Sequence, residues 1–153
     1  MADTYSQIYI QIVFAVKGRQ NLIRPEFKTE LQKYMSGIIK TKGQKMIAIN
    51  NMPDHFHILV WLRPDMAVSN LANAIKANSS AFIHEKRWIP GRFEWQHGFG
   101  AFSYGHSQLG TVVRYIENQE RHHSRRTFRE EYLLLLKRFG IQYKEQFLFE
   151  PTD

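Results

Sequence analysis

Residues 55–62 have the sequence HFHILVWL, an apolar run that contains two histidines. The run is rich in aliphatic and aromatic residues and has no helical period, which indicates a β-strand. Successive side chains of a strand point to opposite faces, so His55 and His57 share one face while Phe56 and Ile58 occupy the other. The stretch therefore predicts a strand that carries paired imidazoles on one side.

The segments on either side of this run supply its neighbours in a sheet. Lys45–Asn50 is a second apolar run, and residues 51–54, NMPD, separate it from His55–Leu62 with residues typical of a turn. These two runs are expected to pair antiparallel. Polar and apolar residues nearly alternate over Tyr5–Val16, which indicates another half-buried strand.

Apolar residues recur at helical spacing elsewhere in the chain. The segments expected to be helices are Pro25–Gly43, Val68–Trp88, Gln108–His123 and Thr127–Phe139. Phe93–Tyr104 is expected to be a strand or hairpin with a glycine turn, and Gln142–Phe149 a short strand or turn. The order β-α-β-β-α-β followed by helices predicts an α+β, ferredoxin-like (RRM-like) antiparallel sheet with helices on one face and a C-terminal tyrosine-bearing helix. The opposite face is expected to be open for a ligand.

Length and composition indicate one basic globular domain, residues 1–153. Hydrophobic residues make up 43% and charged residues 23%, which excludes a disordered or fibrous chain. The net charge is +7, so a polyanionic partner is expected. Aromatic residues make up 14%, which suits either stacking on unpaired bases or an aromatic core.

The chain contains no cysteine, which excludes disulfides, thiolate zinc sites and a cysteine nucleophile. A metal would need histidine, carboxylate or amide ligands. The N-terminal sequence lacks a basic segment followed by an apolar run, and no stretch approaches the roughly 18 apolar residues needed to span a bilayer. We therefore expect a cytoplasmic protein without a membrane segment.

The histidine pair is a candidate metal site. Backbones two residues apart on a strand are roughly 7 Å apart, so His55 and His57 can both turn onto one divalent cation. The alternative is two histidines that only hydrogen-bond their neighbours. Asp54 is either a turn residue or a carboxylate that orients an imidazole. Leu59 and Trp61 share the histidine face, so either the third helix or a second subunit is expected to cover part of it.

The expected helix 108–123 carries a tyrosine beside its buried stripe. A helical wheel separates Tyr115, Gln119 and His122 from the apolar stripe, so Tyr115 flanks the core. Tyr115 and Gln119 are i, i+4 neighbours that can present a phenol and an amide to one point. A phenol with a pKa near 10 needs a metal or base to act as a nucleophile. Phosphodiester cleavage is the reaction suggested by a phenol near a cation site in a basic protein, and a boundary tyrosine without chemistry is the alternative.

Several motifs resemble those of the HUH-type single-tyrosine transposases of small insertion sequences, the TnpA type. The histidine pair lies within NNMPDHFHILVWL, and Tyr115 follows in VVRYIENQERHH. Four further segments also resemble this family, so the resemblance covers nearly the whole chain: IYIQIVFAVKGRQ, IKANSSAFI, WQHGFGAFSYGHSQ and TFREEYLLLLKRFGI. The REP-associated tyrosine transposases, which are host-domesticated relatives, share this core and remain an alternative.

The resemblance implies a single HUH transposase domain that cleaves and rejoins single-stranded DNA. Tyr115 would attack the scissile phosphate and form a 5′-phosphotyrosine with a free 3′-OH. His55, His57 and Gln119 would hold Mg²⁺ or Mn²⁺. The resemblance also implies hairpin-forming transposon ends as substrate and a homodimer with shared active sites.

Two other functions are compatible with these residues. A noncatalytic single-stranded nucleic-acid-binding module would use a ferredoxin-like sheet to stack bases, although the RNA-recognition signature is missing. A metal-dependent hydrolase would use water in place of Tyr115. The role of His122 and His123 stays open between solvent exposure and phosphate contact.

Overall fold

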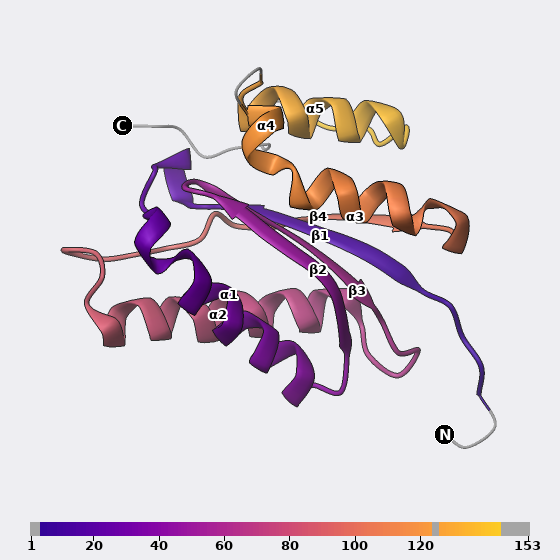
Figure 1. The fold of residues 1–153 in the computed structure, drawn as a ribbon, viewed down its shortest axis with the longest axis horizontal. Helices are drawn as coiled ribbons and strands as arrows, with labels where there is room; N and C mark the ends of the chain where they lie inside the picture. Colours follow the sequence, from indigo (N-terminus) through magenta and orange to yellow (C-terminus); the bar gives the residue numbers. More distant parts are fainter. Residues whose placement is uncertain (1–3, 124–125, 145–153) are drawn as a thin grey trace.

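The computed structural model describes residues 4–123 and 126–144 (Figure 1). The strands are β1 (Tyr9–Ala15), β2 (Lys45–Met52), β3 (His55–Trp61) and β4 (Gly100–Tyr104). The helices are α1 (Pro25–Thr41), α2 (Val68–Lys86), α3 (Leu109–Glu117), α4 (Gln119–His123) and α5 (Phe128–Arg138), with short 3₁₀ turns at Lys17–Arg19 and His106–Gln108. None of these helices, within the described ranges, has the length and apolar content to cross a membrane.

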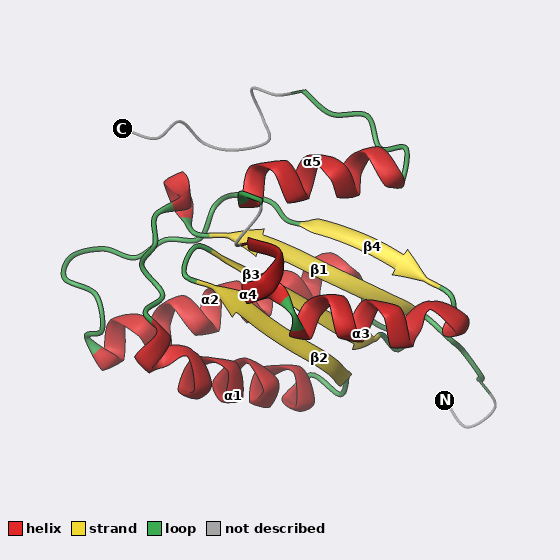
Figure 2. Ribbon diagram, turned by 45° about the horizontal axis from the view of Figure 1, so that its top comes forward, coloured by secondary structure: helices red, strands yellow, loops and turns green. Residues whose placement is uncertain are grey.

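The four strands form one antiparallel sheet in the order β2-β3-β1-β4 (Figure 2). β1 and β3 are the central strands, and Val13 of β1 lies opposite His57 of β3. The element order up to β4 is β-α-β-β-α-β. This confirms the predicted ferredoxin-like α+β fold.

Helices α1 and α2 cover one face of the sheet (Figures 1 and 2). The main core lies between them and the sheet, where Ile12, Ile58, Leu31 and Ile75 are fully buried. Removing these aliphatic side chains from water supplies the main driving force for folding. The face of β3 that carries the histidines points to the other side.

That second face is also covered, which corrects the expectation of an open sheet surface. α3 and α5 lie over it (Figures 1 and 2). Leu59 of β3 packs against Val112 and Ile116 of α3. Phe128 and Leu135 of α5 belong to a separate cluster with strands β1 and β4. The third helix of the same chain therefore covers Leu59, and a second subunit is not needed for it.

The predicted continuous helix 108–123 is interrupted at Asn118, where φ is −99° and ψ is 25°. The cause lies on β2. The Asn50 side-chain amide donates to the backbone carbonyls of Ile116 (2.9 Å) and Glu117 (3.2 Å). A continuing helix would use these carbonyls for its own next turn. A contact from a distant strand thus ends α3 early, and α4 begins at Gln119.

The predicted elements after Phe93 have different outcomes in the structure. Within the predicted strand or hairpin 93–104, only Gly100–Tyr104 is a strand, and Gly98 turns the chain with a φ of +78°. The predicted helix 127–139 is confirmed as α5, with Thr127 accepting a hydrogen bond from the Glu130 backbone as its N-cap. Of the predicted element 142–149, residues 142–144 are irregular and the remainder lies outside the described residues.

Gly100 allows α5 to approach the sheet closely. A Cβ placed on Gly100 would lie 2.8 Å from the ring and hydroxyl of Tyr132 and 3.0 Å from the ring of Phe102. Tyr132 belongs to α5, so a side chain on β4 at this position would push the helix or its tyrosine outward. Close packing between α5 and β4 therefore depends on the missing side chain.

We expect Gly100→Ala to destabilise the protein by about 1–3 kcal/mol, because overpacking displaces Tyr132 and Phe102. Urea denaturation measures this change. The matched control is Gly110→Ala in α3, where the nearest atom is the flexible end of Arg114 at 3.5 Å. Alanine is favoured over glycine inside a helix, so the control should not destabilise. Equal stability of both variants would contradict a close approach at Gly100.

Candidate active site

Both histidines of the pair are fully buried, and each is oriented by a neighbouring side chain. The Nδ1–H of His55 donates to Asp54 Oδ1 at 2.6 Å. The Nδ1–H of His57 donates to Gln11 Oε1 at 2.7 Å, and the Gln11 amide donates to the Tyr104 hydroxyl at 2.7 Å. With Nδ1 used in this way, each imidazole directs its Nε2 toward Glu131, and an Nε2 that carries no proton can bind a cation there. Asp54 therefore orients an imidazole in addition to standing at the turn before β3.

The third member of the cluster is Glu131 of α5, which the sequence analysis did not identify. Its Oε1 lies 2.9 Å from His57 Nε2 and 3.5 Å from His55 Nε2. One ligand atom from each of the three residues lies within 4.8 Å of the others. Two neutral imidazoles and one carboxylate form a donor set that suits a divalent cation with open positions. The arrangement thus fits the metal that the family resemblance implied.

A signal for Glu131 was present in the sequence. Phe128, Glu131 and Leu135 are three and four residues apart, which places the acid on the buried stripe of the helix. All three side chains are at most 6% exposed. A carboxylate on an apolar stripe is rarely buried without a partner. The sequence alone, however, does not show which residues face it.

Tyr115 of α3 completes the cluster. Its ring centroid lies 6.0 Å from that of His57, and its hydroxyl donates to Glu131 Oε2. The two oxygens of Glu131 therefore have different partners, since Oε1 faces the histidines and Oε2 faces the phenol. Burial and the negative charge of Glu131 raise the pKa of the Tyr115 phenol far above its ordinary value.

Gln119 lies beside Tyr115 and is fully buried. It is the first residue of α4, and its side-chain amide donates to the Tyr115 backbone carbonyl at 3.3 Å. A hydrogen bond from Gln119 also favours the ionised phenol and partly offsets the rise in the pKa of Tyr115. The group of possible metal ligands consists of His55, His57 and Glu131. The expected role of Gln119 as a ligand stays a prediction. The side chains of His122 and His123 lie outside the described part of the chain.

The charge balance around His55 differs from that of an ordinary buried histidine. Burial disfavours the charged imidazole, but the hydrogen bonds and negative charges of Asp54 and Glu131 outweigh this effect. The pKa of His55 is therefore raised above its ordinary value. Two carboxylates so close to one imidazole favour a positive charge at this position, either a proton or a cation.

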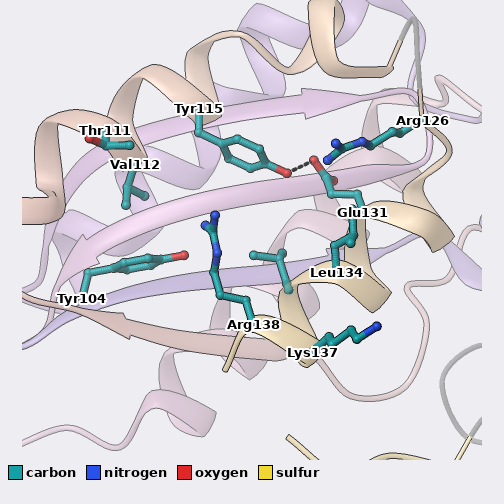
Figure 3. Close-up of a pocket in the computed structure, with 10 residues that line it drawn as sticks. Tyr104, Thr111, Val112, Tyr115, Arg126, Glu131, Leu134, Lys137 and Arg138 are labelled. Carbon is teal, nitrogen blue, oxygen red and sulfur yellow. Dashed lines mark hydrogen bonds between the residues drawn. The ribbon is translucent and has the colours of Figure 1, made fainter. Parts of the chain in front are cut away.

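A cavity of about 540 Å³ adjoins this cluster between α3 and α5 (Figure 3). Tyr115 and Glu131 form one wall of the cavity. The other lining residues are Tyr104, Thr111, Val112, Arg126, Leu134, Leu135, Lys137 and Arg138. The phenol is thus accessible from a space large enough for a small ligand.

The sequence matches the family described as "Transposase IS200 like" over residues 4–119. The chain belongs to this transposase family. The matched region includes His55, His57, Tyr115 and Gln119 and ends before α5. Glu131 therefore lies beyond the part of the chain that the family match covers.

Individual relatives agree with this assignment. This transposase is 25% identical over 118 residues to the ISDra2 transposase TnpA of Deinococcus radiodurans. The aligned region covers 74% of this chain and 84% of that relative. Two solved structures share the fold. One is a transposase from Deinococcus radiodurans, with a TM-score of 0.59, 23% identity and coverage of 76% and 94% of the two chains. The other is a REP-associated tyrosine transposase bound to a REP hairpin, with a TM-score of 0.58, 17% identity and coverage of 78% and 71%.

We expect Glu131→Gln to weaken Mn²⁺ binding by at least about tenfold, because loss of even an outer-shell partner changes metal affinity by about 10–100-fold. Electron paramagnetic resonance of free Mn²⁺ measures the affinity directly. Glu130→Gln is the matched control, since Glu130 precedes Glu131 on α5 and is not part of the cluster. Retained affinity in Glu131→Gln together with a loss in Gln119→Ala would assign the third ligand to Gln119 instead.

Proposed function

We propose that this transposase cleaves and rejoins single-stranded DNA through a covalent bond between Tyr115 and the 5′ phosphate at the break. The observation that supports this most directly is the phenol of Tyr115, which contacts a buried cluster of two histidines and a carboxylate and lines a cavity. A pure binding module needs neither the cluster nor a phenol directed at it. The buried, mutually oriented groups are typical of a catalytic site.

In the proposed reaction the Tyr115 oxygen forms a bond to phosphorus while the bond from phosphorus to the 3′ oxygen breaks. The phenol proton passes to Glu131 Oε2, to which it is already hydrogen-bonded. The departing 3′ oxygen takes a proton from solvent and becomes a free 3′-OH. In the rejoining step a 3′-OH attacks the phosphotyrosine and the phenol is released, so no high-energy cofactor is required.

The proposed metal is Mg²⁺ or Mn²⁺, held by His55, His57 and Glu131, with Gln119 as the alternative third ligand. Such a cation would polarise the scissile phosphate and stabilise the charge that develops on it. Asp54 and Gln11 hold the imidazoles with Nε2 toward the ligand position. This orientation is prepared before substrate binds, which lowers the cost of reorganisation during the reaction.

We further propose that the substrate is an unpaired strand next to a DNA hairpin. Tyr115 is partly buried between α3 and α5, so the scissile phosphate has to leave a duplex to reach it. One structure with this fold is bound to a REP hairpin. The net charge of +7 supports binding to nucleic acid. The same observations suit a host-associated REP-type transposase, which would carry out the same chemistry on REP hairpins in place of transposon ends.

A homodimer is proposed from the family resemblance. Leu59, which suggested a covered interface, is buried by α3 of its own chain, and Trp61 remains 38% exposed. A single chain brings Tyr115 beside His57. An active site shared between two chains is therefore not needed to assemble these groups.

We expect a pool of single-stranded oligonucleotides incubated with Mn²⁺ to give a denaturation-resistant adduct, because the tyrosine stays bonded to the 5′ phosphate. Mass spectrometry should locate the DNA on Tyr115. Tyr115→Phe should lose the adduct and retain DNA binding, since it removes only the nucleophilic oxygen. Excess EDTA should have the same effect.

The matched control is Tyr143→Phe, because Tyr143 is 45% exposed and lies outside the site. It should form the adduct at the wild-type rate. Duplex DNA of the same pool should react poorly. Cleaved DNA without any adduct would contradict the tyrosine mechanism and indicate a hydrolase that uses water.

Mixing two inactive variants tests whether the site is shared. We expect a mixture of Tyr115→Phe and His57→Ala to remain inactive, because Tyr115 contacts Glu131 and His57 of its own chain. The rate of adduct formation measures the outcome. Recovery of activity in the mixture would show that one chain supplies its tyrosine to the histidines of the other.

A further inference from the structure

We propose that the cavity between α3 and α5 binds the nucleotide next to the scissile phosphate, and that Arg138 contacts a phosphate of that nucleotide. The inference rests on the proposed single-strand chemistry and adds a binding subsite to it. Arg138 and Leu134, the residues whose role in this subsite is tested below, do not belong to the catalytic cluster.

The position of the cavity supports a flanking nucleotide as its occupant. Tyr115 lines it, so a phosphate at the phenol has its neighbouring nucleotide within or beside the same space. Its volume of about 540 Å³ lies within the usual range of small-ligand pockets, about 300–1,000 Å³. A DNA strand whose phosphate contacts the Tyr115 phenol can therefore place the neighbouring nucleotide in this cavity.

The charges of the lining fit a nucleic-acid backbone. Two arginines, Arg126 and Arg138, line the cavity together with one carboxylate, Glu131. Figure 3 shows the guanidinium of Arg138 directed into the cavity, between the Tyr104 hydroxyl and Tyr115. Lys137, on the same turn of α5, also borders the cavity, but its amine is directed away from the hydroxyls of Tyr104 and Tyr115 (Figure 3). Arg138 is thus the cation best placed to meet a phosphate near the phenol.

The remaining walls suit a base or sugar. The ring of Tyr104 and the apolar side chains of Val112 and Leu134 line the cavity, and Leu134 is 46% exposed. Aromatic and apolar surfaces of this kind stack on nucleobases without sequence preference. The Tyr104 hydroxyl accepts a hydrogen bond from Gln11, which also binds His57. Tyr104, the aromatic residue of the cavity lining, is therefore connected to His57 through hydrogen bonds of Gln11.

One wall of the cavity belongs to a part of the chain outside the family match. Leu134 and Arg138 lie on α5, whereas the match ends at residue 119. The α5 side of the subsite therefore lies beyond the region that the family match covers. It follows from the way in which α5 packs over this particular sheet.

The test compares two charge losses on one helix turn. A fluorescein-labelled single strand of about 12 nucleotides, within the site sizes of single-strand binders, is titrated in EDTA so that no cleavage occurs. We expect Arg138→Gln to weaken binding several-fold and to reduce the slope of log affinity against log salt by about 0.7, the value for one lost phosphate contact on a single strand. Lys137→Gln removes the same charge from the last turn of α5, where the amine is directed away from the phenol, and should reduce the slope much less than Arg138→Gln.

A second pair of variants tests the cavity itself. Leu134→Asp places a negative charge in the lining and should weaken binding by about tenfold through repulsion of the phosphate. Ile141→Asp is the control, because Ile141 is similarly exposed, at 41%, and does not line this cavity. Circular dichroism melting curves confirm that each variant is folded.

The outcomes separate this inference from the proposed function. The subsite would be overturned if Arg138→Gln lost no more affinity than Lys137→Gln, or if Leu134→Asp lost no more than Ile141→Asp. In that case an adduct at Tyr115 would still support the transposase chemistry. A selective effect of Arg138→Gln and Leu134→Asp supports the subsite. The same selective effect without any adduct in the wild-type protein would overturn the tyrosine chemistry and leave a single-strand binding cavity.

Discussion

The buried carboxylate of Glu131 is the interaction on which the rest of the site depends. A carboxylate that is 3% exposed is costly unless charged or hydrogen-bonded partners surround it. Glu131 has such partners on both oxygens, because Oε1 faces His55 and His57 and Oε2 accepts from Tyr115. The carboxylate joins the histidine strand to the tyrosine helix. The packing of α5 over the sheet therefore gives the imidazoles and the phenol a common partner.

This contact is one part of a polar network that crosses the covered face of the sheet. Tyr104 on β4 accepts from Gln11 on β1, and Gln11 accepts from His57 on β3. His57 then meets Glu131 on α5, which in turn accepts from Tyr115 on α3. Buried hydrogen bonds of this kind strengthen one another, and loss of one member leaves its neighbours unsatisfied. The network therefore holds several elements at fixed distances around the phenol.

Local sequence patterns predicted the elements well, whereas contacts between distant elements escaped them. Strand alternation placed His55 and His57 on one face, and this required only the two-residue period. The break at Asn118 was missed because it depends on Asn50 of β2, which binds carbonyls more than sixty residues away. Glu131 was missed for a similar reason. Its place on an apolar stripe is visible in the sequence, but its partners become visible only when α5 lies on the sheet.

The amide of Asn50 also fixes the position of the helix that carries Tyr115. It binds the carbonyls at the C-terminal end of α3, only one and two residues after Tyr115. That end of the helix is thereby anchored to β2, whereas Gly105 and Gly110 lie near its other end. Two hydrogen bonds from one side chain oppose sliding of the helix along the sheet. They therefore help to keep the phenol of Tyr115 beside its partners.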